Sequence, residues 1–508
     1  MTLPKSATTP APTPITVAAS VPVAWLPIGG AAAAAAAVLL ATNDRYDYHR
    51  DELYFRLLKP AWGYVDQPPL TPLLARASIA LFGDTVWAMR LPATVCVVAA
   101  IVLTALVTRE LGGGRGAQAM CAWGYAFAAV PLLFGHIMLT ATVDLPVWAA
   151  VLLFALRALL RSEPRWWLAA GAVAGLSLYN KHLVVLLLIS LGVGLLWLGP
   201  RSTLRSPWLW AGVGLALVIG SPNLIYQATH GFPQLDMAAA LSQNKGGEAR
   251  VQLLPFQLVL LGPPLTAIWV AGLVALLRRH AWRPARALAA AYPVLMVIVL
   301  LSGGQMYYPL GLVSFLYAAG CVPTADWIAR RSGTRRPLVV AGVALNTLVT
   351  LVLALPLLPV DVLGHTPIPE INQGARDQIG WPAYTRQVAD AYRALAPADR
   401  ARAVLITGNY GEAGALDRYR QAEGLPDKIY SGQNQLYHYG PPPEADTIAV
   451  VVGLPLARLQ AQFASCTEAG VLDNGVGVEN EEQGRIIAVC RDPVGGWAAA
   501  WPHFQHFD

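Results

Sequence analysis

The sequence predicts an all-α membrane bundle of about eleven transmembrane helices, followed by a small extracytoplasmic α/β domain at the C-terminal end. Hydrophobic residues make up 55% of the 508 residues and charged residues only 13%, and the mean hydropathy is +0.47. Soluble domains carry about 25% charged residues, so a bilayer suits most of this chain better than water does. Besides this composition, the fold prediction rests on many long apolar runs before residue 358 and on their absence after it.

The apolar runs are each about long enough to span a bilayer, the shortest only marginally. The first is interpreted as a retained helix rather than a signal peptide, because the basic segment before it is weak. Residues 1–21, rich in Pro, Thr and Ala, are predicted to form a disordered cytoplasmic tail. The eleven runs are 22–42, 88–108, 116–135, 144–161, 165–180, 182–199, 208–226, 253–277, 286–302, 306–329 and 337–358.

The charges between the runs predict the orientation in the membrane. Alternate loops are rich in arginine, and the positive-inside rule places these loops in the cytoplasm. The N-terminus is then cytoplasmic, whereas the first outer loop 43–87 and the domain 359–508 lie outside. The net charge of +6 is spread over these loops, and no motif for nucleic acid accompanies it, so no nucleic-acid partner is expected. Abundant Arg and Ala indicate a bacterial source.

Two outer segments between the runs have a predicted character of their own. Leu70–Phe82 is apolar but too short to span, and we expect an amphipathic helix lying in the membrane interface. Segment 227–252 is polar and contains several glycines, which predicts a mobile loop.

Short apolar runs separated by turns predict an α/β domain in residues 359–508. Ala403–Thr407, Ile448–Val452 and Ile486–Cys490 are predicted as strands, and Gly411–Gly424 and Leu456–Phe463 as helices.

The five cysteines divide between the two predicted parts. Cys96, Cys121 and Cys321 lie in apolar runs and are interpreted as small core residues. Cys466 and Cys490 lie in the C-terminal domain, where an oxidising compartment favours a disulfide between them. No Cys-x-x-Cys spacing occurs, so the cysteines indicate neither a zinc site nor a redox site.

Three acidic motifs fall on the predicted outer face. Asp51-Glu52 offers a general base for a hydroxyl or a cation site, although a solvated helix cap would look the same. Asp66, in Gly63-Tyr-Val-Asp-Gln-Pro-Pro-Leu70, precedes two rigid prolines, a pattern that also begins many helices. Asp144 begins the run 144–161, where the helix dipole alone would favour an acid.

Basic and aromatic residues on the same face could hold a phosphate. Lys181 and His182 occupy a tight outer turn, and Tyr307 and Tyr308 follow Gly303-Gly304-Gln305. A cation there could stabilise a departing phosphate. Tyr and Lys are equally common as interface anchors.

Several other functions lack support in the sequence. Gly112-Gly-Gly-Arg-Gly116 has no following Lys-Ser/Thr, and neither His-Glu-x-x-His nor Gly-x-Ser-x-Gly occurs, so nothing indicates ATP hydrolysis, a zinc peptidase or a serine hydrolase. A transporter or flippase of a lipid-linked precursor, or a non-catalytic envelope-assembly protein, remains an alternative. A transporter would place functional acids near the membrane midplane, whereas these acids gather on one outer face, which favours an enzyme.

The order of the acidic motifs resembles glycosyltransferase family 39, the group of protein O-mannosyltransferases and lipid A aminoarabinose transferases. The resemblance covers about residues 40–330. It is carried by Asp51-Glu52, Gly63–Leu70, Thr142–Pro146, Gly175–Lys181, Ser221-Pro222-Asn223 with His230-Gly231, and Gln305–Tyr308.

The resemblance implies the membrane C-type glycosyltransferase fold. It implies inverting transfer of a hexosyl or pentosyl group from a polyprenyl-phosphate sugar to an envelope lipid, glycan or protein, outside the cytoplasmic membrane. Asp51 aligns with the catalytic base. No cofactor is required, although Asp66 and Asp144 could hold a divalent cation. The residues expected to bind substrate are Glu52, Asp66, Gln67, Asp144, Lys181, His182, Tyr307 and Tyr308.

Two positions depart from the aminoarabinose transferases. These tend to have Lys where this chain has Gln67, and a basic residue where it has Tyr54. The phosphate contacts are therefore expected to differ, and the resemblance does not predict an aminoarabinose donor.

Overall fold

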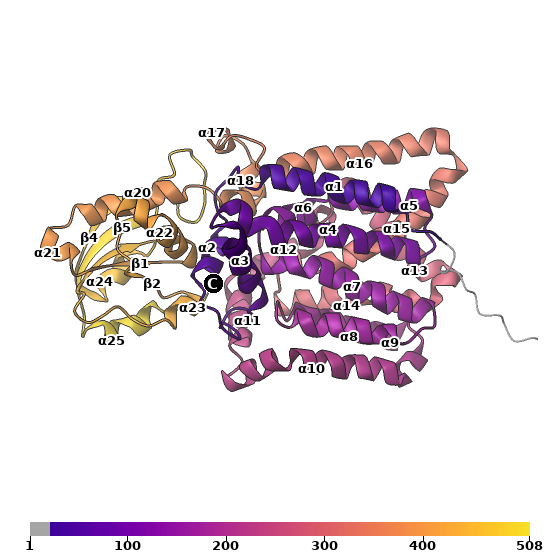
Figure 1. The fold of residues 1–508 in the computed structure, drawn as a ribbon, viewed down its shortest axis with the longest axis horizontal. Helices are drawn as coiled ribbons and strands as arrows, with labels where there is room; N and C mark the ends of the chain where they lie inside the picture. Colours follow the sequence, from indigo (N-terminus) through magenta and orange to yellow (C-terminus); the bar gives the residue numbers. More distant parts are fainter. Residues whose placement is uncertain (1–20, 508) are drawn as a thin grey trace, which may run out of the picture.

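The computed structural model describes residues 21–507, so the tail predicted to be disordered lies almost entirely outside the described residues. A long helical bundle occupies one end of the molecule and a sheet domain the other (Figure 1). Two short helices, α2 (Arg50–Leu57) and α3 (Leu70–Phe82), lie between them. Helix α3 has the bounds that the sequence predicted.

All the predicted apolar runs are helical. Within residues 21–507, seven helices are long and apolar enough to cross a membrane, or nine if each of two bent pairs is one span. The two remaining runs form shorter helices of 12 and 15 residues, α8 and α9. The protein is thus a multi-pass membrane protein. The helices of the bundle are α1 (Trp25–Thr42), α4 (Val86–Glu110), α5 (Arg115–Ala126), α6 (Ala129–His136), α7 (Thr140–Leu160), α8 (Trp166–Ser177), α9 (Leu183–Trp197), α10 (Pro207–Thr229), α11 (Pro233–Asn244), α12 (Gly246–Val259), α13 (Thr266–Arg278), α14 (Arg286–Ser302), α15 (Leu310–Arg330) and α16 (Ser332–Ala354), with 3₁₀ turns η1 (Arg201–Arg205), η2 (Pro263–Leu265) and η3 (His280–Ala285).

The two bent pairs are held by side chains of α16. The chain bends by 55° between α5 and α6 and by 71° between α12 and the segment 263–278. Each break leaves carbonyl groups without helical partners, which is costly inside a membrane. The Asn346 amide donates to the carbonyls of Phe127 (3.2 Å) and Leu261 (3.1 Å), and the Thr350 hydroxyl also donates to Phe127 (2.7 Å). One helix therefore satisfies both breaks.

The mobile loop predicted over 227–252 is wrong. The segment is mostly helical, because α10 continues to Thr229, α11 follows, and α12 begins at Gly246. The chain turns at Gly231 and Phe232, both at positive φ, and Pro233 begins α11. The polar residues that suggested a loop are largely exposed on these helices.

The C-terminal domain has a five-stranded sheet of order β2-β1-β3-β5-β4, in which β1 is parallel to β2 and β3, and β5 is antiparallel to β3 and β4. The strands are β1 (Ala403–Thr407), β2 (Ile429–Ser431), β3 (Ile448–Val452), β4 (Phe463–Val471) and β5 (Ile486–Pro493). The helices after the bundle are α17 (Val360–Leu363), α18 (Ile368–Ile371), α19 (Gln373–Arg376), α20 (Trp381–Arg393), α21 (Pro397–Arg400), α22 (Tyr410–Glu423), α23 (Asn434–Tyr437), α24 (Leu456–Gln460), α25 (Trp497–Ala500) and the 3₁₀ turn η4 (Trp501–Phe504).

The three predicted strands are present, and the sequence missed β2 and β4. Strand β4 is mostly exposed and polar, so it lacks the apolar run that marks a buried strand. The predicted helix Leu456–Phe463 ends at Gln460, because Phe463 already belongs to β4 and packs edge-on against Trp497.

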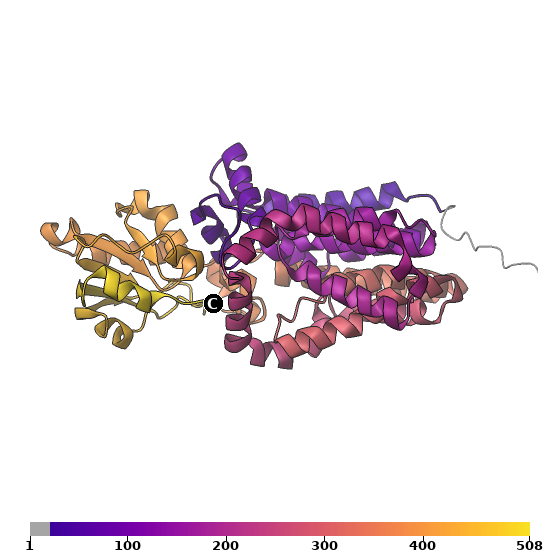
Figure 2. The same cartoon turned by 90° about the horizontal axis from the view of Figure 1, so that it is seen from below.

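The C-terminal domain and the bundle share one apolar core. Leu53 and Phe55 of α2 lie in the same buried cluster as Trp381 of α20 and Leu405 and Val450 of the sheet. The opposite face of the sheet is covered by Trp497, Trp501 and Phe504. Figures 1 and 2 show the sheet domain seated on the end of the bundle at which α2 and α3 lie. The loop 43–87 and the C-terminal domain therefore lie at the same end of the bundle, as the charge pattern predicted.

Cys466 and Cys490 are paired residues of β4 and β5 and form a disulfide. We expect alkylation of the unfolded, unreduced protein to label only Cys96, Cys121 and Cys321. Prior reduction should add two further labels. Intact-mass measurement reads the number of labels directly, and five labels without reduction would contradict the disulfide.

Candidate functional site

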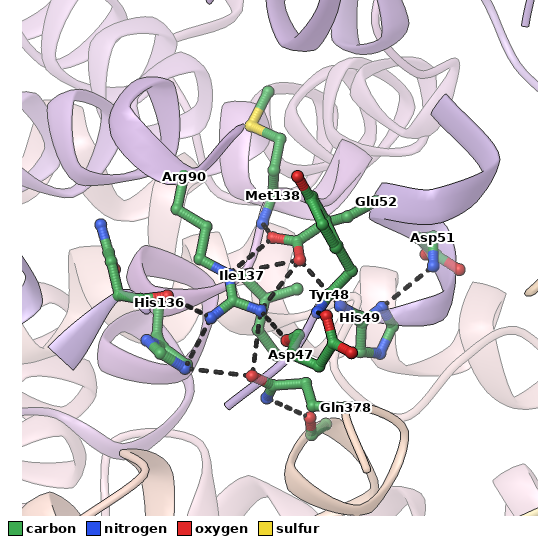
Figure 3. Close-up of polar contacts among 12 residues, drawn as sticks. Asp47, Tyr48, His49, Asp51, Glu52, Arg90, His136, Ile137, Met138 and Gln378 are labelled. Carbon is green, nitrogen blue, oxygen red and sulfur yellow. Dashed lines mark hydrogen bonds and ion pairs between the residues drawn. The ribbon is translucent and has the colours of Figure 1, made fainter. Parts of the chain in front are cut away.

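Helix α2 separates the two neighbouring carboxylates Asp51 and Glu52. The helix begins after His49, whose ring nitrogen Nδ1 accepts from the Asp51 N–H (3.2 Å) and whose N–H donates to Glu52 Oε2 (2.8 Å). Consecutive helical residues point about 100° apart. Glu52 consequently turns into the bundle, whereas Asp51 lies on the other side of His49 (Figure 3).

Glu52 is buried in an ion pair with Arg90 of α4. Both side chains are inaccessible to solvent, and the guanidinium Nη2 lies 2.9 Å from Glu52 Oε2. Glu52 Oε1 also accepts from the Met138 N–H at 2.9 Å. Both carboxylate oxygens are thus occupied by protein donors, and Glu52 serves to position the loop. This differs from the expectation that Glu52 contacts the substrate.

Arg90 joins several parts of the chain through this network (Figure 3). It donates to the carbonyls of Asn43 (2.6 Å) and Asp47 (2.7 Å) before α2, and to Gln378 Oε1 (3.0 Å) before α20. Its Nη1 also lies 3.3 Å from His136 Nε2. A single buried cation therefore fixes the end of α1, the start of α2 and the entry to the C-terminal domain.

Asp51 meets the C-terminal domain. The Tyr410 hydroxyl, on the first residue of α22, donates to Asp51 Oδ1 at 2.9 Å. Burial, and after it the charge of Asp51, raises the pKa of Tyr410 well above its usual value, so the hydroxyl stays protonated as a donor. Asp51 is half-buried, and within residues 21–507 its other carboxylate oxygen accepts no hydrogen bond.

A second tyrosine holds Asp66. The Tyr54 hydroxyl donates to Asp66 Oδ1 (3.1 Å), and the Tyr54 ring stacks on Tyr410 with centroids 4.6 Å apart. Burial raises the pKa of Asp66 to about 7; its own backbone N–H and Tyr54 act in the opposite direction, and the charge of Asp51 adds to the rise. Gln67 beside it is buried, and its Nε2 has no hydrogen-bond partner in the described part of the chain.

Asp144, Lys181, Tyr307 and Tyr308 form a neighbouring cluster. Asn180 donates to Asp144 Oδ1 at 3.1 Å, while the buried Oδ2 has no protein partner among the described residues. Lys181 Nζ lies 3.4 Å from the Tyr307 hydroxyl and 5.0 Å from the centre of the Tyr308 ring. Asp144 and both tyrosines line a largely apolar cavity between α7 and α15. The structure thus brings these four predicted residues together.

Helix α3 links the two clusters. Its first N–H, on Leu70, donates to the Tyr179 carbonyl (2.7 Å), and the Thr71 hydroxyl donates to Asn180 Oδ1 (2.5 Å). The segment 66–71 therefore carries Asp66 at one end and contacts the neighbour of Lys181 at the other. His182 differs, because its Nε2 lies 2.9 Å from Asn223 Oδ1 and Asn223 in turn donates to the Trp62 carbonyl. His182 thus helps to hold the loop 43–87 through Asn223.

Among the described residues, the structure does not group Asp66 and Asp144 with further metal ligands. Within residues 21–507, no group of three or more His, Cys, Asp and Glu side chains could hold a metal ion. Asp66 and Asp144 lie in different hydrogen-bonded clusters.

From the sequence, no role in the site was assigned to Arg90, Tyr410 or Gln435, and Tyr54 was noted only as a departure from the aminoarabinose transferases. Arg90 carries the one signal that could have been read, a charge inside an apolar run, which is costly and marks a functional or structural site. Tyr410 and Gln435 contact the site from more than 350 residues away in sequence, and no local pattern shows that.

The sequence model of the dolichyl-phosphate-mannose-protein mannosyltransferase family matches residues 66–226 of this chain, a segment that contains Asp66, Asp144 and Lys181. A crystal structure of ArnT from Cupriavidus metallidurans bound to undecaprenyl phosphate is 15% identical, and the match covers 91% of this chain and 97% of that chain with a TM-score of 0.61. The resemblance to glycosyltransferase family 39 is confirmed.

The structural likeness extends over nearly the full length of ArnT. The apo form of that protein is 16% identical with the same coverage and TM-score. At this identity the match shows the fold, which is the membrane C-type glycosyltransferase fold with a small C-terminal sheet domain. An oligosaccharyltransferase from Archaeoglobus fulgidus, AglB, is 13% identical over 84% of this chain and 69% of that chain, with a TM-score of 0.47, too low to carry an argument. No curated protein matches by sequence.

Proposed function

We propose that this protein is an inverting glycosyltransferase that moves a hexosyl or pentosyl group from a polyprenyl-phosphate sugar to an acceptor in the cell envelope. The observation that carries the proposal is the position of Asp51. It is half-buried, and one of its carboxylate oxygens accepts no hydrogen bond from another described residue, whereas its neighbour Glu52 is fully engaged by protein donors. A general base needs a free oxygen within hydrogen-bond reach of the proton that it removes.

In this proposal Asp51 takes the proton of an acceptor hydroxyl as its oxygen attacks the anomeric carbon. The bond from that carbon to the phosphate oxygen breaks, and the polyprenyl phosphate leaves with the electron pair. Lys181 and the hydroxyl of Tyr307 supply positive charge and a donor for the leaving phosphate. The apolar cavity beside Asp144 offers a place for the first part of the prenyl chain.

The donor class is supported by the family model and by the ArnT structure, which holds undecaprenyl phosphate. The identity of the transferred sugar has less support than the class of its lipid carrier. Tyr54, which replaces a basic residue of the aminoarabinose transferases, is occupied by Asp66 and is not free to hold a phosphate. We therefore do not propose an aminoarabinose donor.

We further propose that the reaction takes place outside the cytoplasmic membrane. Helix α4 carries Arg90 in its first turns, next to the C-terminal domain, and ends at Glu110 at the opposite end of the bundle. There Glu110 pairs with Arg157 in the last turn of α7 and with Arg161, which ends that helix and begins an arginine-containing loop. The positive-inside rule places that end in the cytoplasm, so the site and the C-terminal domain lie outside.

Transfer of radiolabelled sugar from a panel of polyprenyl-phosphate sugars tests the proposal. Membranes with the wild-type protein should transfer label from at least one donor to an envelope extract. Absence of transfer from every donor, with correctly folded protein present, would contradict the proposal and favour a transporter or flippase.

The same assay tests the expectation that no cofactor is required. Because a lipid phosphate is already a good leaving group, we expect transfer to persist in EDTA. Loss of transfer in EDTA and its recovery on adding Mg²⁺ or Mn²⁺ would show instead that a cation takes part, with Asp66 and Asp144 as the first ligands to substitute.

A further inference from the structure

We propose that the C-terminal domain completes the catalytic site, with Tyr410 as the positioning residue for Asp51. The inference rests on the proposed function and extends it to a part of the chain outside the segment that the family model matches. Three features carry it: a hydrogen bond, a ring stack, and the packing that fixes α22 against α2.

The hydrogen bond sets the orientation of the carboxylate. The Tyr410 hydroxyl occupies Oδ1 of Asp51 at 2.9 Å and leaves the other oxygen to accept a proton. An unrestrained aspartate would rotate among several side-chain positions, and a misplacement of about 1 Å can slow a reaction about a hundredfold. A fixed donor on one oxygen removes that freedom.

The Tyr410 ring is itself held on two sides. It stacks on Tyr54, and the guanidinium carbon of Arg50 lies 5.1 Å from the ring centre. Arg50 is paired with Glu481 of the C-terminal domain. The hydroxyl therefore has a defined position relative to α2.

The backbone at Tyr410 is fixed as well. Asn409 caps α22 by accepting from the Glu412 N–H (2.8 Å), and the Tyr410 N–H donates to Gln433 Oε1 (2.7 Å). Gly414, one turn later, lies so close to α2 that an added Cβ would be 2.6 Å from the Cβ of Leu53. Glycine thus allows α22 to approach α2 closely enough for the Tyr410 hydroxyl to reach Asp51.

The same domain holds Asp66 through the other tyrosine of the stack. The Gln435 N–H donates to the Tyr54 hydroxyl (3.2 Å), and Gln435 Oε1 accepts from the Val65 N–H (3.1 Å), next to Asp66. Each of the two acids thus receives a hydrogen bond from one of two stacked tyrosines. The spacing between Asp51 and Asp66 is set by this pair and not by the outer loop alone.

The test is Tyr410→Phe, which keeps the ring, the stack and the contact with Arg50 and removes only the hydroxyl. We expect kcat for sugar transfer to fall about tenfold to a hundredfold, with the KM values of donor and acceptor unchanged. The matched control is Tyr419→Phe. Tyr419 lies on the same helix, and its hydroxyl donates to Asp47 across the same interface at 2.6 Å, so the variant should keep the wild-type kcat.

A double variant separates this inference from the proposed function. In the Asp51→Asn background, Tyr410→Phe should cause no further loss, because a residue that acts only through Asp51 has nothing left to position. Wild-type kcat in Tyr410→Phe, an equal loss in Tyr419→Phe, or fully additive losses in the double variant would each overturn the positioning role while transfer by the wild type persists. Absence of transfer by the wild type would overturn the proposed function and this inference together.

Discussion

Asp51→Asn is expected to lower the turnover of sugar transfer by about two to four powers of ten, which is the usual contribution of a general base. Asparagine keeps the size of the side chain, and its carbonyl oxygen can still accept from the Tyr410 hydroxyl, so the fold should be preserved. What is lost is the oxygen that takes the acceptor proton. Initial rates of label transfer in membranes, normalised to the amount of folded protein, measure the effect.

The matched control for Asp51→Asn is Asp44→Asn. Asp44 lies in the segment between α1 and α2, seven positions earlier, and is exposed. It makes no hydrogen bond or ion pair with another described residue, so transfer should be unaffected. Wild-type turnover in well-folded Asp51→Asn protein would remove Asp51 from the role of base. Loss of turnover in both variants would indicate a general effect of charge on this face.

Arg90→Met is expected to destabilise the protein by about 3–5 kcal/mol, the usual cost of removing one partner of a buried ion pair. The substitution leaves the Glu52 carboxylate buried without its cation, and the carbonyls of Asn43 and Asp47 lose their donor. Because Arg90 also joins the bundle to the entry of the C-terminal domain through Gln378, we expect a lower thermal midpoint and poor recovery of monodisperse protein from detergent.

Two further variants test whether the burial of the ion pair causes the loss of stability expected for Arg90→Met. Arg279 and Asp326 also form an ion pair, at 2.7 Å, but their side chains are 33% and 53% exposed. Arg279→Met should therefore cost less than about 1 kcal/mol. Replacing both Arg90 and Glu52 by apolar residues should be less harmful than Arg90→Met alone, since no unpaired charge remains. Equal stability of Arg90→Met and the wild type would contradict the structural role given to this pair.

The order of the apolar runs, the buried strands β1, β3 and β5, and the positions of the three acidic motifs could all be predicted from the sequence. These features depend on local composition and on periodicity, which a bilayer or a buried strand imposes on neighbouring residues. Helix α11, the part of α12 before residue 253 and the polar strand β4 could not be predicted, because their exposed faces resemble loops.

The sequence by itself determined that Asp51 and Glu52 are adjacent acids next to a membrane span, and that Asp66, Asp144 and Lys181 face the same side. Only the tertiary structure decided which of the two adjacent acids remains available. Glu52 is enclosed by Arg90, 38 positions away, and Asp51 meets Tyr410, 359 positions away. Neighbours on a helix point in different directions, so their environments come from distant segments. The local sequence pattern places the two adjacent acids on one helix, and the packing of distant segments around α2 decides which carboxylate is enclosed and which keeps an unengaged oxygen.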